Sequence, residues 1–224
     1  MRIKDVSKAA LITFIIGFLT IITMMTVFVE LAEDVLEKEK FEMDHYFLNI
    51  LVFEQNSLVY QTMEFLTEAG SVLFLTIASV LIVLFLLITR QNKWYIIFFI
   101  INMIGISAFT KVLKLIFERD RPELIAQYDG TGFSFPSGHS TGSIAFYGFL
   151  IYLLWKKVSH GWMRSTMIII VGLFAVLIPF SRVVLGVHYF TDILAGILLG
   201  LTWLITCIIL LEYLIWRRNI KKVR

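Results

Sequence analysis

The sequence has little cysteine and little charge, and each shortage excludes a class of protein. One cysteine, Cys207, occurs in 224 residues, so a disulfide within the chain and a cysteine-pair metal or redox site are both excluded. Charged residues make up 17% of the chain, whereas soluble domains have about 25%. The basic residues are spread over short loops and form no single patch, which argues against nucleic-acid binding.

Hydrophobic residues take the place of the missing charge. They make up 58% of the chain and give it a mean hydropathy of +0.84. Their grouping into long runs is typical of an integral membrane protein, because a spanning helix needs about 20 mainly apolar residues. We therefore predict an all-α integral membrane protein with six transmembrane helices, forming one membrane-embedded domain over residues 1–224. The predicted spans are about 9–29, 71–89, 94–117, 138–155, 165–185 and 190–216.

The basic residues predict the orientation of these spans. With both ends of the chain in the cytoplasm, most of the 20 basic residues lie on the cytoplasmic side, as the positive-inside rule requires. The first run is longer than the roughly 7–15-residue core of a signal peptide, so we expect it to be retained. The connection 30–70 is acidic and contains regularly placed apolar residues. We expect an amphipathic extracytoplasmic segment there, with its acidic side chains facing solvent.

Three polar clusters interrupt the apolar pattern, and on this topology all of them lie at the outer ends of spans. Ionisable groups at membrane depth cost about 2.5–3.5 kcal/mol each on insertion scales, and they therefore tend to be functional. The first cluster is the segment 111–122. Helical spacing would place four residues on one face, namely Lys111, Lys114, Glu118 and Arg121. Pro122 disfavours continued helix at Arg121.

The second cluster is Pro136-Ser137-Gly138-His139, at the start of a predicted span. Proline is favoured in the first turn of a helix, where its missing N–H costs nothing. Ser137 and Gly138 would then present free backbone N–H groups at the positive end of the helix, which is a ready site for an anion. His139 adds a titratable group on the same turn.

The third cluster is the segment 179–192. His188 and Asp192 are four residues apart, so a helix would place them on one face. Arg182 would lie about 120° around a continuous helix from His188. Both side chains can face one site only if the chain bends between them, and Gly186 is the natural place for that bend.

Together the clusters predict a receptor for a phosphate group, because guanidinium forks match phosphate oxygens in bidentate fashion. A neutral His188 would attack phosphorus, with Asp192 holding the ring and steadying its developing charge. His139 would protonate the leaving oxygen and later activate water. No cluster of carboxylate, histidine or cysteine ligands suggests a metal, so the fixed cations would neutralise the charge of the transition state.

Three blocks in these clusters resemble the tripartite signature of the type 2 phosphatidic acid phosphatase (PAP2) superfamily. They are Lys114–(six residues)–Arg121-Pro122, then Pro136-Ser137-Gly138-His139, then Ser181-Arg182–(five residues)–His188–(three residues)–Asp192. Within the superfamily the chain resembles the bacterial phosphatidylglycerophosphatases and undecaprenyl-diphosphate phosphatases. The resemblance implies a bacterial cytoplasmic-membrane enzyme that acts on phosphatidylglycerol phosphate, undecaprenyl diphosphate or phosphatidic acid at the extracytoplasmic interface.

The same resemblance implies a role for each signature residue. The nucleophile would be His188, oriented by Asp192, and the general acid and base would be His139. The phosphate ligands would be Lys114, Arg121, Ser137, Gly138 and Arg182. The implied mechanism needs neither metal nor cofactor and passes through a phosphohistidine intermediate.

Two other functions would use the same residues. A lipid phosphotransferase also needs two histidines and an aspartate, but it passes the phosphoryl or head group to an acceptor lipid instead of water. A transporter of an anionic solute would line a path through the membrane with charged groups. The polar clusters lie at one end of the predicted spans and the inner halves of the helices are apolar, which favours an enzyme over a transporter.

Overall fold

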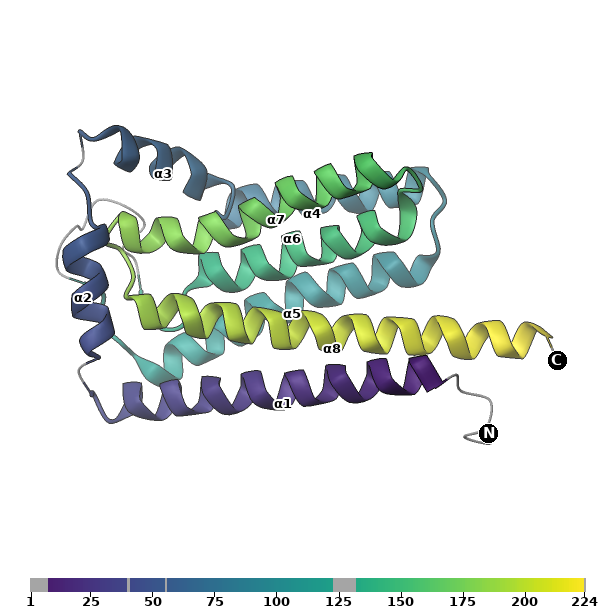
Figure 1. The fold of residues 1–224 in the computed structure, drawn as a ribbon, viewed down its shortest axis with the longest axis horizontal. Coiled ribbons are helices and arrows are strands. Elements are labelled where there is room, and N and C mark those ends of the chain that lie inside the picture. The colour runs from purple at the N-terminus through teal and green to yellow at the C-terminus, as the bar shows by residue number, and fades with distance from the viewer. Residues whose placement is uncertain (1–7, 40, 55, 123–131, 224) are drawn as a thin grey trace.

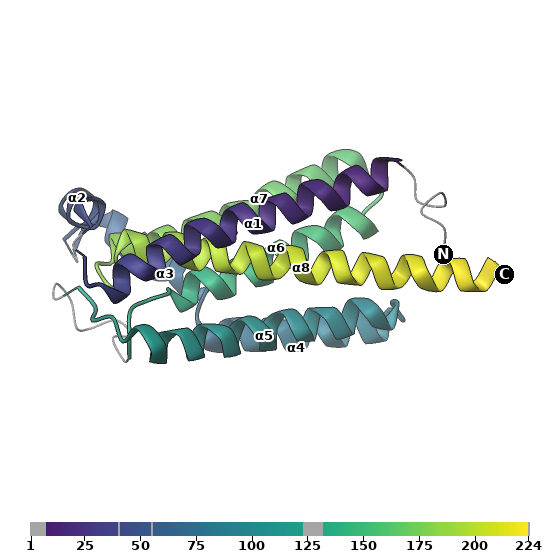
Figure 2. The same ribbon diagram turned by 90° about the horizontal axis from the view of Figure 1, so that it is seen from below.

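The computed structural model describes residues 8–39, 41–54, 56–122 and 132–223, and these residues form eight α-helices and no strand. The helices are α1 (Lys8–Leu36), α2 (Glu42–Leu51), α3 (Leu58–Glu68), α4 (Val72–Ile88), α5 (Lys93–Phe117), α6 (Gly138–Lys157), α7 (Gly161–Val184) and α8 (Phe190–Val223). Helices α1 and α4–α8 run along the long axis of a bundle (Figures 1 and 2). Helices α2 and α3 lie at one end, and α1 begins and α8 ends at the other (Figure 1).

The all-α prediction is confirmed for the described residues, and a helix lies at each predicted span. Four stretches are long and apolar enough to cross a membrane: Phe14–Leu36, Lys93–Phe117, Gly161–Val184 and Phe190–Asn219. A fifth results if α3 and α4, which are bent by 45° relative to each other, form one span. Helix α6 is not among them because its first turns are polar. The count of six spans therefore stays a prediction.

The first turns of α6 can be polar because the helix lies inside the bundle, where it packs against α4, α5, α7 and α8. Hydrogen bonds join it to α5: the Asn102 Nδ2 donates to the carbonyl of Ala145 at 2.9 Å, and Thr110 Oγ1 donates to Thr141 Oγ1, also at 2.9 Å. Small residues let α8 approach α6 closely, as at many helix contacts within membranes. At Gly196, a Cβ atom would lie 2.9 Å from the backbone oxygen of Ser137.

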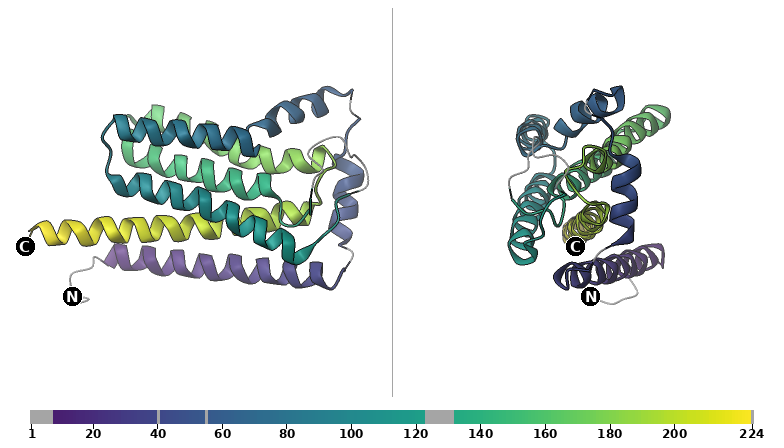
Figure 3. Two further views of the ribbon diagram at one scale, coloured as in Figure 1. Left: turned by 180° about the vertical axis from the view of Figure 1, so that it is seen from behind. Right: turned by 90° about the vertical axis from the view of Figure 1, so that its left-hand side faces the viewer.

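The segment predicted to lie on the surface is helical. Helix α1 continues to Leu36, and α2 then crosses the end of the bundle (Figure 3), where it packs against α7 and α8. Glu33, Glu37 and Glu42 are exposed, as expected. The expectation of a solvent-facing side chain is wrong for Asp44, whose exposed fraction is 3%. Asp44 instead binds Thr191 on α8 and Arg119 in the segment that follows α5.

Replacement of Gly196 by alanine is predicted to destabilise the bundle. The new Cβ would lie 2.7 Å from the Ser140 Cβ, and neither α6 nor α8 has a flexible group there that can move away. Overpacking of this kind costs about 1–3 kcal/mol. Thermal unfolding in detergent should therefore begin at a lower temperature in Gly196→Ala than in the wild type.

Gly172→Ala is the matched control, because its Cβ would meet only the end of Ile151 at 3.9 Å. Alanine is favoured over glycine in a helix by about 1 kcal/mol, so this variant should be at least as stable as the wild type. Equal stability of the two variants would show that close α6–α8 packing at Gly196 is not a constraint.

Candidate active site

The chain between α7 and α8 bends and carries His188 into the site. Helix α7 ends at Val184, and Gly186 has a φ of 69°, a left-handed conformation that glycine adopts readily. The predicted bend at Gly186 is thus confirmed. The prediction that one helix carries both His188 and Asp192 is wrong, because α8 begins at Phe190. The two side chains still meet, with 3.2 Å between His188 Nδ1 and Asp192 Oδ2.

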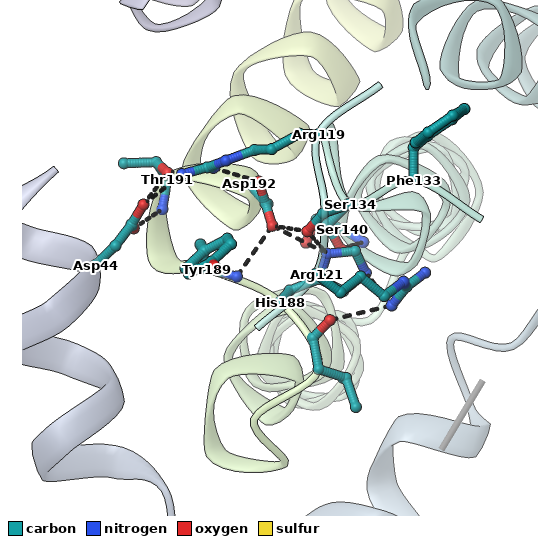
Figure 4. Close-up of polar contacts among 12 residues, drawn as sticks. Asp44, Arg119, Arg121, Phe133, Ser134, Ser140, His188, Tyr189, Thr191 and Asp192 are labelled. Atoms are coloured by element: carbon teal, nitrogen blue, oxygen red, sulfur yellow. Dashed lines mark hydrogen bonds and ion pairs between the residues drawn. The ribbon is translucent and has the colours of Figure 1, made fainter. Parts of the chain in front are cut away.

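Neighbouring groups determine which nitrogen of His188 carries the proton. The Arg121 Nη1 lies 3.3 Å from His188 Nε2 (Figure 4), and a guanidinium can only donate. His188 Nε2 is therefore the acceptor, and Nδ1 carries the proton that is donated to Asp192. This arrangement leaves the lone pair of Nε2 on the side of the cationic residues.

Burial keeps His188 neutral. Its exposed fraction is 1%, and removal from water lowers its pKa to about 4 from the ordinary 6.5. Asp192 opposes this shift, whereas the charges of Arg121 and Arg182 add to it. At neutral pH the ring is therefore an uncharged imidazole, which is the form that can act as a nucleophile.

Both carboxylate oxygens of Asp192 have bonding partners. It is fully buried, and its Oδ2 accepts the hydroxyl of Ser134 as well as the backbone N–H of Tyr189 at 2.9 Å (Figure 4). Its Oδ1 forms an ion pair with Arg119 Nη1 at 2.5 Å. Ser134 and Arg119 are absent from the sequence prediction, because no local spacing connects either residue to position 192.

The first cluster reaches the site in a different way from the one predicted. Helix α5 ends at Phe117, and Glu118 caps it in a left-handed conformation with a φ of 44°. The predicted shared helical face is therefore wrong for Glu118 and Arg121, which lie beyond the end of α5. Arg121 approaches from the segment after the helix, where its Nη1 donates to the carbonyl of Val187 at 3.0 Å. Lys114 Nζ donates to the carbonyl of Phe133, next to Ser134.

The N-terminus of α6 also differs from its prediction. Ser137 is the N-cap, so Pro136 precedes the helix and is not in its first turn. The backbone N–H of Ser137 donates to the carbonyl of Asp192 at 3.0 Å and is therefore not free for an anion. The N–H groups of Gly138 and His139 follow in the first turn, where a helix supplies no acceptor of its own.

The remaining predicted residues lie around the same point. Arg182 is 1% exposed and donates through Nη1 to Thr67 Oγ1 at 3.0 Å. The His139 ring is also buried, at 8% exposure. Four groups are close enough to act electrostatically on this ring, namely Arg182, His188, Arg121 and Lys114. The three polar clusters thus converge on one region at the end of the bundle that α2 crosses.

Comparison with known proteins finds a matching family and two curated relatives. The family described as the PAP2 superfamily matches residues 94–216. Phosphatidylglycerophosphatase B of Bacillus subtilis (strain 168) is 45% identical over 92 residues, which are 41% of this chain and 45% of that protein. An uncharacterized 22.5 kDa protein in the cps region of Klebsiella pneumoniae is 38% identical over 76 residues, 34% of each chain. The matched segments thus span less than half of either curated relative.

A solved structure is similar over most of the chain. It is the crystal structure of the transmembrane PAP2 type phosphatidylglycerolphosphate phosphatase from Bacillus subtilis. The TM-score is 0.77 and the sequence identity is 28%, and the similarity covers 87% of this chain and 96% of that one. The likeness therefore includes helices that lie outside the segment matched by the family.

The ring of His188 is predicted to stay neutral down to an unusually low pH. Because its pKa is lowered to about 4, the imidazole should gain its second proton only near pH 4, about 2.5 units below the ordinary value. The measurement is a titration of ¹⁵N-labelled histidine followed by NMR in detergent. The His188 signals are assigned by their loss in His188→Asn. A midpoint near 6.5 for these signals would contradict the prediction.

Proposed function

The chain belongs to the PAP2 superfamily, and on that premise we propose that it is a metal-independent phosphatase that hydrolyses the terminal phosphate of a lipid phosphate. One observation carries the proposal: a buried, neutral His188 is held by Asp192 through Nδ1, while its Nε2 faces Arg121. A histidine held in this way has a lone pair directed at the place where cationic groups would bind a phosphate.

In the first step, His188 Nε2 attacks phosphorus and the bond from phosphorus to the lipid oxygen breaks. For this step His139 must be protonated while the negatively charged phosphate is bound. It donates this proton to that oxygen, so the lipid leaves as an alcohol, or as a monophosphate if the substrate is a diphosphate. The imidazole acquires positive charge as the phosphohistidine forms. Asp192 stabilises this charge from the opposite nitrogen.

In the second step, a water molecule attacks the phosphoryl group. His139, which has lost its proton, removes one from this water as the bond between nitrogen and phosphorus breaks. Inorganic phosphate leaves, and both histidines return to their starting protonation states. The same residue serves as acid and then as base, so the cycle closes without another proton carrier.

The phosphoryl oxygens carry negative charge throughout, and fixed positive groups would stabilise it. The residues placed for this are Lys114, Arg121 and Arg182, together with the backbone at Gly138. Ser137 would contribute through its hydroxyl, because its N–H already binds Asp192. Among the described residues, no group of three His, Cys, Asp or Glu side chains is placed to hold a metal ion.

We further propose that the site lies at the extracytoplasmic surface of a bacterial cytoplasmic membrane, with both ends of the chain in the cytoplasm. The basic termini support this orientation through the positive-inside rule, since α1 begins and α8 ends opposite the site (Figure 1). Phosphatidylglycerol phosphate is the first substrate to test, since a curated relative and the similar solved structure both carry names that refer to it. Undecaprenyl diphosphate and phosphatidic acid follow.

The function is tested by phosphate release from these three lipids in detergent, with and without a chelator. We expect release from at least one lipid and an unchanged rate after metal removal, because fixed cations take the part of the metal. Loss of activity in the chelator that returns with added metal would contradict the metal-independent mechanism. Transfer of phosphate to an added acceptor lipid without release would indicate a phosphotransferase.

The two histidines are predicted to differ in what their variants accumulate. His188→Ala should form no phosphorylated protein, and its phosphate release should fall by at least about 10³-fold, as when a nucleophile is removed from a comparable site. His139→Ala should still be phosphorylated by an aryl phosphate, whose leaving oxygen needs little protonation. It should then accumulate phosphohistidine, because no base activates water.

The measurement is acid-labile ³²P retained on the protein after rapid quenching. Both variants must elute from size exclusion and unfold thermally like the wild type for the comparison to hold. Accumulation of label in His188→Ala and not in His139→Ala would reverse the two assignments.

A further inference from the structure

We propose that Asp44 is a positioning residue of this active site, acting on His188 through Arg119 and Asp192. The inference rests on the proposed function, since it concerns the same nucleophile. It assigns a role to helix α2, which lies outside the segment matched by the family. It also concerns an acidic residue that the sequence pattern places among solvent-facing neighbours.

Asp44 binds two residues next to Asp192: Arg119, which forms an ion pair with Asp192, and Thr191, which precedes Asp192 in the chain. Its Oδ2 forms an ion pair with Arg119 Nη2 at 2.7 Å and accepts the hydroxyl of Thr191 at 2.7 Å (Figure 4). Its Oδ1 accepts the backbone N–H of Thr191 at 2.9 Å. Asp44 therefore holds the first turn of α8, which carries Asp192, as well as the arginine that binds Asp192.

Arg119 links the two carboxylates like a bridge. Its Nη2 faces Asp44 and its Nη1 faces Asp192. Two aromatic rings lie over the guanidinium, that of Phe41, which precedes α2, and that of Tyr189, which precedes α8. Their centroids are 5.4 and 4.4 Å from Arg119 Cζ. Burial alone would lower the pKa of Arg119, but Asp192 and Asp44 outweigh it and raise the pKa, so the bridge stays charged.

This bridge fixes the orientation of the Asp192 carboxylate. Because Arg119 occupies Oδ1, the other oxygen is directed at His188, Ser134 and the N–H of Tyr189. Removal of Asp44 would leave Arg119 free to turn toward Asp192 alone or toward solvent. Either movement would loosen the carboxylate that holds the tautomer of His188.

Among the described residues, the Asp44 side chain bonds Arg119 and Thr191, and neither residue is a proposed phosphate ligand. Its loss should therefore lower kcat and leave KM within about twofold, the pattern of an interaction that matters in the transition state. Outer partners of a carboxylate–histidine pair at metal sites change activity by about 10–100-fold, and we expect a fall of that size for Asp44→Asn.

A double-mutant cycle distinguishes this role from a separate effect on folding. If Asp44 acts through Arg119, then Asp44→Asn should have no further effect on kcat in an Arg119→Gln background. If the fold-losses in kcat of the two single variants multiply in the double variant, the proposal is overturned. The cycle is measured on the full chain in detergent, with the lipid phosphate that the wild type hydrolyses fastest.

Glu42→Gln is the matched control, because it removes one negative charge from the exposed face of the same helix. Its kcat should equal that of the wild type, and an equal loss in Glu42→Gln and Asp44→Asn would overturn the specific role of Asp44. If Asp44→Asn does not fold, Asp44→Glu replaces it in the cycle. The same non-additivity with Arg119→Gln then supports the proposal, and additivity overturns it.

A readout without turnover separates this inference from the function itself. ¹⁵N NMR should show one His188 tautomer, with the proton on Nδ1, in the wild type and Glu42→Gln, and a mixture of tautomers in Asp44→Asn. An unchanged single tautomer in Asp44→Asn would overturn the positioning role. A wild type that releases no phosphate from any lipid would refute the proposed function and leave this NMR result interpretable.

Discussion

The structure depends on the burial of one carboxylate, that of Asp192, at the end of an apolar bundle. A buried charge is tolerated only when it is paired and its oxygens are hydrogen-bonded. Asp192 satisfies this through Arg119, Ser134, His188 and a backbone N–H. Arg119 follows α5, Ser134 precedes α6, and His188 and Tyr189 lie in the connection between α7 and α8. The hydrogen bonds and the ion pair of Asp192 therefore hold these connecting segments in place.

The same requirement explains why the catalytic groups and the structural groups are difficult to separate. The hydrogen bond that holds the His188 ring also satisfies one oxygen of Asp192. The carbonyl of Asp192 accepts from Ser137 and so anchors the start of α6. Arg121 is held by the carbonyl of Val187 while it faces His188. The hydrogen bonds and ion pairs that compensate for the burial of these charged groups therefore also preorganise the site.

Helix α6 shows how far an apolar pattern predicts a membrane fold. Its first turns are polar and the helix falls short of a spanning composition, yet it packs against four other helices, α4, α5, α7 and α8. The hydroxyl of Thr141 and the carbonyl of Ala145 bind side chains of α5, so these two groups need no water. Hydropathy reports contact with lipid, and a helix that contacts mainly protein is under no such constraint.

Local spacing in the sequence determined the helices, the bend at Gly186 and the identity of the polar clusters, because these depend on neighbours within a few turns. Tertiary structure alone decided that Arg121 reaches His188, that the Asp192 carbonyl accepts the N–H of Ser137 and that Ser134 joins the site. It also decided the burial of Asp44, whose partner Thr191 is 147 residues away. Such pairs form because a buried charge must find an opposite charge or a donor wherever the fold brings one. Such long-range pairs leave no periodic pattern in the sequence from which they could be predicted.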